Sequence, residues 1–148
     1  MKHLFSLTAG LLLATLAAHA AADAPPAGVW IGSGASYRHD FAFDFHPDGS
    51  LRLLGRVTDE MTARRARMPA DERAAFDAHT TTLAGGLWLA MPGTWRMLDD
   101  GRVHLHGDPP PGRDKAFDMD FALRVVDARH VKLRTEFGIE QTLEPLEP

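Results

Sequence analysis

The stretch FDMDFALRV, residues 117–125, decides the fold because apolar and polar side chains alternate along it. Its large apolar positions are Phe117, Met119, Phe121, Leu123 and Val125, and its charged positions are Asp118, Asp120 and Arg124. Alternation with period two is typical of a β-strand that buries one face and exposes the other. Asp127-Ala128-Arg129 predicts a turn after this strand, and the alternation resumes from residue 131 to residue 137. These residues therefore predict an antiparallel hairpin.

Towards the N-terminus, two more pairs of alternating segments are joined by turns that contain glycine. Residues 41–45 lead through HPDGS, residues 46–50, into residues 51–57. The alternation returns at Gly93 and passes through Asp99-Asp100-Gly101 into a strand near residue 103. Asp favours such turns, and Gly accepts the positive φ that they need. With a first strand from residue 28 and a last one over 139–143, the chain has about eight strands and a mainly β fold, an antiparallel eight-stranded barrel or a barrel-like sandwich.

Residues 59–85 interrupt the alternation and predict a helical insertion. Pro69 followed by Asp71 is typical of a helix start, because proline loses no hydrogen bond there and an acid favours the helix dipole. Phe76 and Leu83 fall at helical spacing and form one modest apolar stripe. Because this stripe must be buried somewhere, we expect the insertion to cover the barrel end opposite Trp30 as a lid.

The N-terminus has the parts of an export signal. Lys2 supplies a positive charge, an apolar run follows from Leu4 to Ala18, and Ala18-His19-Ala20 offers small residues to a signal peptidase. The pattern predicts a signal peptide over residues 1–20, with cleavage before Ala21. The run is shorter than the roughly 20 residues that span a bilayer as a helix. We therefore expect a soluble periplasmic or secreted protein with no membrane span after cleavage.

The remaining chain is predicted to have a flexible leader over residues 21–27 and a single domain over residues 28–148. Removing residues 1–20 removes one of 16 basic residues and none of the 20 acidic residues, so the net charge changes from −4 to −5. An acidic domain lacks the basic patch that nucleic-acid binding requires. The absence of cysteine excludes disulfides, thiolate metal sites and a cysteine nucleophile. The hydrophobic core must therefore supply the stability.

Gly28-Val29-Trp30, at the expected start of the first strand, resembles the G-x-W signature of lipocalins. The phrase FDFHPDG, residues 43–49, and a second G-x-W at Gly93-Thr94-Trp95 are similar to bacterial lipocalin-like domains. The resemblance covers most of residues 28–143 as a pattern. It implies an eight-stranded barrel with the tryptophan packed across its closed end and a small apolar ligand inside.

The candidate ligand site consists of the residues expected to face the barrel interior. They are Trp30, Phe41, Phe43, Phe45, Trp95, Phe117, Met119, Phe121 and Phe137. These side chains could line a cavity for an apolar ligand. They could equally form a packed core, because small barrels are commonly filled by their own side chains. The two tryptophans could likewise pack at a barrel end without touching a ligand.

His104 and His106 are a candidate metal site. Two residues apart on a strand, their imidazoles share one outward face at a spacing of about 6.5–7 Å. Such a pair binds Zn²⁺ or Cu²⁺ when a neighbouring strand adds a third ligand. The candidates for that ligand are His46, Asp44, Asp118 and Asp120. The alternative is a solvated strand face in a sequence rich in histidine.

No motif indicates a particular catalytic chemistry. Carboxylate pairs such as Asp118 and Asp120 fall on outward faces, where nothing desolvates them. The G-x-S-x-G, H-E-x-x-H and P-loop motifs do not occur. We therefore expect a non-enzymatic exported domain without a cofactor, which binds a small apolar ligand or a protein partner. The alternative is a structural or metal-handling protein with a filled barrel.

Overall fold

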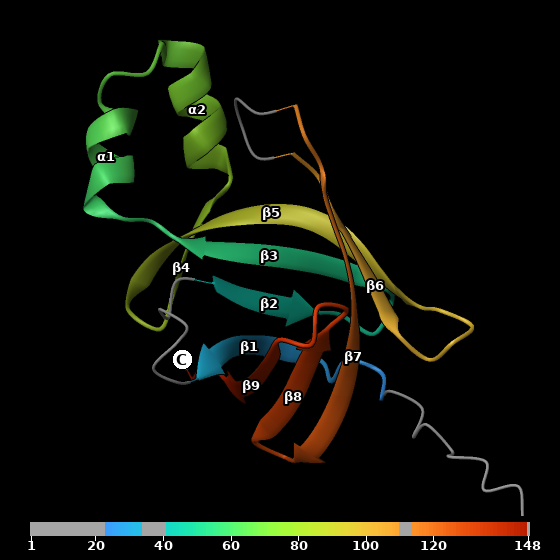
Figure 1. The fold of residues 1–148 in the computed structure, drawn as a ribbon. Coiled ribbons are helices and arrows are strands. Elements are labelled where there is room, and N and C mark those ends of the chain that lie inside the picture. Colours follow the sequence, from blue (N-terminus) through green and yellow to red (C-terminus); the bar gives the residue numbers. More distant parts are fainter. Residues whose placement is uncertain (1–22, 34–40, 110–113, 148) are drawn as a thin grey trace, which may run out of the picture.

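The computed structural model describes residues 23–33, 41–109 and 114–147, and these residues form one antiparallel sheet with two short helices beside it (Figure 1). In chain order the elements are β1 (Gly28–Ser33), β2 (Phe41–Phe45), β3 (Ser50–Arg56), α1 (Asp59–Arg65), α2 (Ala70–Ala78), β4 (Thr80–Leu83), β5 (Gly86–Met97), β6 (Val103–Gly107), β7 (Phe117–Asp127), β8 (His130–Thr135) and β9 (Glu140–Pro145).

Eight of these strands close into a barrel because the two ends of the sheet meet. The order around the barrel is β3-β2-β1-β9-β8-β7-β6-β5, and β5 pairs back onto β3. Every pairing is antiparallel, and the first and last strands of the chain, β1 and β9, are neighbours. The mainly β, eight-stranded antiparallel barrel predicted from the alternation is therefore confirmed. The short strand β4 pairs only with β5 and lies outside the closed set.

The predicted glycine turns are present where the strands reverse. In the β2–β3 turn the N–H of His46 donates to the carbonyl of Ser50 at 3.1 Å, and Gly49 has a φ of 86°. In the β5–β6 turn the N–H of Gly101 donates to the carbonyl of Leu98 at 2.9 Å, with a φ of 83° at the glycine. Since side chains with a Cβ rarely adopt such values, glycine fixes both turns.

The helical prediction for residues 59–85 is correct only as far as Ala78. Residues 80–83 form β4, which turns into β5 through Ala84 and Gly85, and both residues have positive φ. Two successive residues with positive φ make the tight turn that suits a β-hairpin. β5 also begins at Gly86, seven residues before the expected start of its block at Gly93.

The two helices stand beside the barrel and do not cover its interior (Figure 1). Thr58 caps α1 by accepting a hydrogen bond from the N–H of Met61, and Arg65 of α1 forms an ion pair with Asp77 of α2. Among the described residues, no helical side chain belongs to either hydrophobic cluster of the barrel. The predicted lid is therefore wrong. Leu83, expected on its apolar stripe, lies on β4 and packs at the outer wall.

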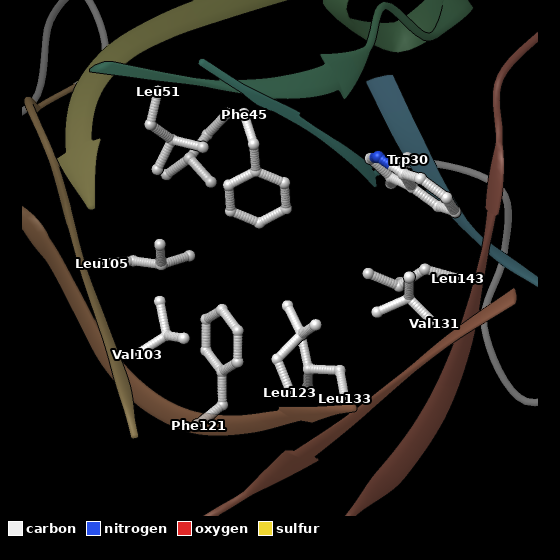
Figure 2. Packing of buried hydrophobic residues seen from close by; sticks show 11 residues of the cluster. Trp30, Phe45, Leu51, Val103, Leu105, Phe121, Leu123, Val131, Leu133 and Leu143 are labelled. Carbon is white, nitrogen blue, oxygen red and sulfur yellow. The ribbon is translucent and has the colours of Figure 1, made fainter. Parts of the chain in front are cut away.

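The barrel interior is packed with large apolar side chains (Figure 2). The buried cluster comprises Trp30, Phe45, Leu51, Leu53, Val103, Leu105, Phe121, Leu123, Val131, Leu133 and Leu143. These side chains come from seven of the eight barrel strands, and β5 adds the partly buried Met91 and Trp95. They alternate with outward residues, so closing the sheet buries the middle of the inward faces. Ala42, Leu54 and Trp88 form a smaller buried cluster on the outer wall.

One end of the barrel is closed by both tryptophans and the N-terminal segment. The Trp30 indole N–H donates to the carbonyl of Pro26 at 3.1 Å, and that of Trp95 donates to the carbonyl of His46 at 2.8 Å. The backbone N–H of Asp23 donates to the Leu123 carbonyl at 2.7 Å. The segment predicted to be a flexible leader is thus in contact with the barrel from Asp23 onwards. The predicted signal peptide, residues 1–20, lies outside the described residues.

No helix among the described residues is long and apolar enough to cross a membrane.

Candidate ligand site at the barrel mouth

The two ends of the barrel differ in their connections. The tryptophan end carries the β2–β3, β5–β6 and β7–β8 turns together with residues 23–27. At the opposite end, which we call the mouth, β2 and β7 begin, β3 leads to the helices and β8 turns into β9. The mouth is therefore the end at which the longer connections leave the barrel.

Side chains on the inward face become more exposed towards the mouth. Along β2, Phe45 is fully buried, Phe43 is partly buried and Phe41 is 52% exposed. Along β7 the same order holds for Phe121, Met119 and, at 38% exposed, Phe117. Since β2 and β7 lie on opposite sides of the barrel, exposed apolar side chains flank the mouth on both sides. At the other end of β7, Val125 is exposed to a similar extent, 39%.

The strand β9 repeats this gradient. Leu143 is fully buried, Gln141 is partly buried and Ile139, just before the strand begins, is 58% exposed. Three inward-facing rows thus end at the mouth in a large apolar side chain that water can reach. Single exposed apolar residues are common, but a ring of them around one opening is characteristic of a binding surface.

The β8–β9 turn presents a further aromatic ring beside this opening. Phe137 is 82% exposed, yet its turn is firmly hydrogen-bonded. The N–H of Gly138 donates to the Thr135 carbonyl and that of Thr135 donates to the Ile139 carbonyl, both at 2.9 Å. Gly138 has a φ of 79°. The prediction that Phe137 faces the interior is wrong, because β8 ends at Thr135 and the turn directs residue 137 outwards.

A pair of rings from opposite walls separates the mouth from the packed centre. Phe43 of β2 and Phe121 of β7 have ring centroids 6.5 Å apart, and Phe43 also stacks on Phe45 at 5.8 Å. Met91 and Met119 pack against the same cluster and are only partly buried. The aromatic contact across the barrel forms a floor, in which Phe121 is fully buried and Phe43, Met91 and Met119 stay partly accessible.

The predicted candidate residues thus divide by depth. Trp30, Phe45 and Phe121 are buried in the core, and Phe43, Trp95 and Met119 are partly buried against it. Phe41 and Phe117, predicted to point into the interior, are instead exposed at the rim, because each is the first residue of its strand. Sequence alternation identifies the face of a residue but not its depth along the barrel axis.

One polar side chain lies on the inward face at the mouth and was not predicted as a site residue. Gln141 pairs with Leu133 across β8 and β9, and Leu143, two residues on, belongs to the core cluster. Its amide nitrogen Nε2 is fully buried and has no hydrogen-bond partner among the described residues. Buried amide nitrogens are almost always hydrogen-bonded in native proteins.

The two histidines of the candidate metal site each pair with a carboxylate on the outer face of β6 and β7. His104 Nδ1 lies 2.6 Å from Asp120 Oδ1, and His106 Nδ1 lies 2.9 Å from Asp118 Oδ1. These pairs are directly opposite each other in the strand register. The hydrogen bond from His106 is the main cause that lowers the pKa of Asp118 below its usual value of 3.8.

This arrangement does not assemble the third ligand that the metal hypothesis needs. Among the described residues, no group of three histidine, aspartate or glutamate side chains is placed to hold a metal ion. Asp118 and Asp120, two of the proposed third ligands, are bonded to the histidine ring nitrogens themselves. The geometry is that of a row of cross-strand histidine–carboxylate hydrogen bonds.

Asp44, another proposed third ligand, is buried on the outer wall, with 4% of its surface exposed. Arg52, its neighbour across the β2–β3 hairpin, donates from Nε to Asp44 Oδ2 at 2.7 Å. His46 Nε2 lies 3.3 Å from the same oxygen. The signal for this pair was in the sequence, since the acid and the base are placed to face each other across the HPDGS turn.

Next to Arg52, the outer wall has a cavity of about 380 Å³ that no motif indicated. Its lining comes from three separate segments and includes Arg52, His79, Thr80 and Thr81. The Arg52 charge is already paired with Asp44, and none of the aromatic residues or methionines expected to hold a ligand lines this cavity. The mouth is therefore the better candidate for an apolar ligand.

Comparison with models of known families, with curated proteins and with solved structures finds no match to this chain.

Proposed function

We propose that this chain is a non-enzymatic, lipocalin-like protein that binds a small apolar ligand at the barrel mouth. The observation that carries the proposal is the exposure gradient on the inward faces of β2, β7 and β9. The inward face of each strand is buried at the barrel centre and ends at the mouth in an exposed residue, which is Phe41, Phe117 or Ile139. A ligand that covered these side chains would remove apolar surface from water, which contributes about 25 cal/mol per Å².

The depth of the proposed site follows from the contact between Phe43 and Phe121. Because this contact joins opposite walls, the ligand rests on it and does not pass into the core. The ligand class is therefore a molecule with a short apolar part, such as a ring or the end of an alkyl chain. Binding of a protein partner is a second candidate, favoured by Phe137, which a firmly hydrogen-bonded turn holds in solvent.

The proposal includes export of the protein. Its support is the pattern of Lys2, the apolar run from Leu4 to Ala18 and the small residues at Ala18 and Ala20. The intact mass of the protein recovered from the periplasm or medium should correspond to a chain that begins at Ala21, or at Asp23 if cleavage follows Ala22.

The experiment that tests ligand binding is titration with diphenylhexatriene, a hydrocarbon that fluoresces in apolar surroundings and not in water. The double variant Phe41→Ser and Phe117→Ser removes both rings of the rim. The matched control is Val126→Ser, because Val126 is 51% exposed, nearly the same as Phe41, but lies at the tryptophan end.

We expect saturable binding to the wild type and to the control, and at least tenfold weaker binding to the double variant, a change of about 1.4 kcal/mol. No saturable signal in the folded wild type would overturn the proposal. So would equal losses in the double variant and the control, because the probe would then not bind at the mouth.

A further inference from the structure

The inward-facing row of β9 differs from those of β2 and β7 in its second residue, counted from the exposed residue at the rim. That residue is Phe43 on β2 and Met119 on β7, whereas on β9 it is Gln141. The next inward residue of β9, Leu143, is fully buried in the core. Gln141 therefore adds a polar group to an otherwise apolar floor.

The amide nitrogen of Gln141 is a hydrogen-bond donor without an acceptor. Nε2 is shielded from solvent, and no described residue accepts from it. Leaving a buried donor unpaired costs about 1–3 kcal/mol, which is a large fraction of the stability of a small domain. A leucine or methionine at this position would avoid that cost, and both residue types occur at neighbouring inward positions. The donor is therefore explained most simply by a ligand that supplies the acceptor.

From this we infer that the ligand of the mouth is an apolar molecule with one hydrogen-bond acceptor, such as an ester, ketone or carboxyl oxygen, and that Gln141 Nε2 donates to it. This inference rests on the proposed function and adds its polar specificity. In ligand sites that are mostly apolar, a few placed polar groups fix the orientation of the ligand. The acceptor would lie at the level of Gln141, and the apolar part would extend over Phe43 and Met119 towards the rim.

Thr135 brings a hydroxyl to the same side of the mouth. Its Oγ1 accepts a hydrogen bond from the N–H of Ile139 at 3.2 Å, and this bond does not use the O–H of Thr135 itself. Leu133, which faces Gln141 across β8 and β9, is apolar. The acceptor of the ligand is assigned to Gln141, and substitution of that side chain tests this assignment.

The test compares two probes that differ by one acceptor, diphenylhexatriene and its derivative with a propionic acid methyl ester. Their dissociation constants are measured for the wild type, for Gln141→Met and for a control, Glu140→Gln. Methionine matches glutamine in length and lacks the donor, whereas Glu140 is the outward neighbour on β9 and is exposed. Thermal unfolding of each unliganded variant checks that it is folded, and Gln141→Leu is the second variant if Gln141→Met is not.

We expect the wild type and Glu140→Gln to bind the ester about three- to tenfold more tightly than the hydrocarbon, as one added hydrogen bond to a neutral acceptor allows. Gln141→Met should bind both probes equally and hold the hydrocarbon at least as tightly as the wild type does. If the wild type binds both probes equally, Gln141 does not donate a hydrogen bond to the ligand. This inference then fails, while the proposed function stands. If neither probe binds to the wild type, the proposed function fails as well.

Discussion

Replacing Phe121 by alanine tests whether the barrel centre is a packed core. Phe121 is fully buried, belongs to the interior cluster and contacts the Phe43 ring across the barrel. Removing the ring loses the free energy gained by transferring it from water to the core. It also leaves an empty space, because hydrogen bonds around the whole barrel keep the opposite walls apart. The closed sheet limits collapse, so we expect a loss of about 3–5 kcal/mol in the free energy of unfolding. For a domain of this size the melting temperature should fall by roughly 10–20 °C.

The assay is urea unfolding followed by circular dichroism, with the slope of the transition compared between variants to check two-state behaviour. Phe137→Ala is the matched control, because it makes the same chemical change at a residue that is 82% exposed. The control should change the unfolding free energy by about 0.5 kcal/mol or less. Equal effects at the two positions would refute the burial that the structure assigns to Phe121.

Three further predictions concern a close backbone contact and the histidine surface. Gly93→Ala should lower the free energy of unfolding by about 1–3 kcal/mol, because the added Cβ would lie 2.2 Å from the carbonyl oxygen of His106. Gly55→Ala should leave it nearly unchanged in the same urea assay, because no atom lies within 4 Å of the Cβ position. The hydrogen bond from His106 lowers the pKa of Asp118. The stability that Asp118 contributes should therefore be present above about pH 3.8 and lost as the pH falls below that value. The variant Asp118→Asn should lack this pH dependence in melting curves. Adding Zn²⁺ at neutral pH should leave the melting temperature unchanged, because His104 and His106 are paired with carboxylates and no described residue completes a site.

Each of these predictions has a contrary result. Similar losses at both glycines would mean that the β5–β6 contact is not tight. A stability difference between Asp118→Asn and the wild type that persists unchanged at pH 3 would contradict the hydrogen bond from His106 as the origin of the lowered pKa. A rise in melting temperature with Zn²⁺ that disappears when His104 and His106 are both replaced by alanine would restore the metal hypothesis.

Much of the barrel could be predicted because its strands alternate strictly. Residues 117–125 have one apolar face, of which Phe121 and Leu123 are buried, and a one-residue slip in strand pairing would turn that face towards solvent. The turns at Gly49 and Gly101 were identified by residues with a specific backbone preference. The strand β4 was missed because three consecutive threonines have no alternation, and their hairpin turn places an alanine, Ala84, at positive φ.

The sequence predicted which strand face each candidate residue lies on, but not how deep in the barrel it lies. Phe41, Phe45, Phe117 and Phe121 look alike in the sequence, since each is an inward aromatic residue of a strand. Their burial differs because the strands are longer than the packed centre of the barrel, and only the three-dimensional register shows which positions reach the rim. Gln141 was overlooked for a related reason, because an isolated glutamine carries no signal until its neighbours are known to be core residues.

The helical insertion illustrates a limit of amphipathic patterns. The stripe from Phe76 to Leu83 crosses the junction between α2 and β4, so its helical spacing was accidental. Phe76, a residue of α2, is nevertheless buried, and it does not belong to the cluster of the barrel interior. A short apolar stripe therefore predicted that a residue is buried, but not against which partner.

The most direct test of a ligand site at the mouth is an NMR titration that follows the methyl groups of ¹³C-labelled methionine as diphenylhexatriene is added. Met91 and Met119 pack at the floor of the mouth, Met97 lies at the tryptophan end, and Met61 and Met68 lie in the helical insertion. Mouth binding predicts saturable shifts of the Met91 and Met119 signals, with the other three unchanged. Shifts confined to Met97, or to Met61 and Met68, would contradict the account.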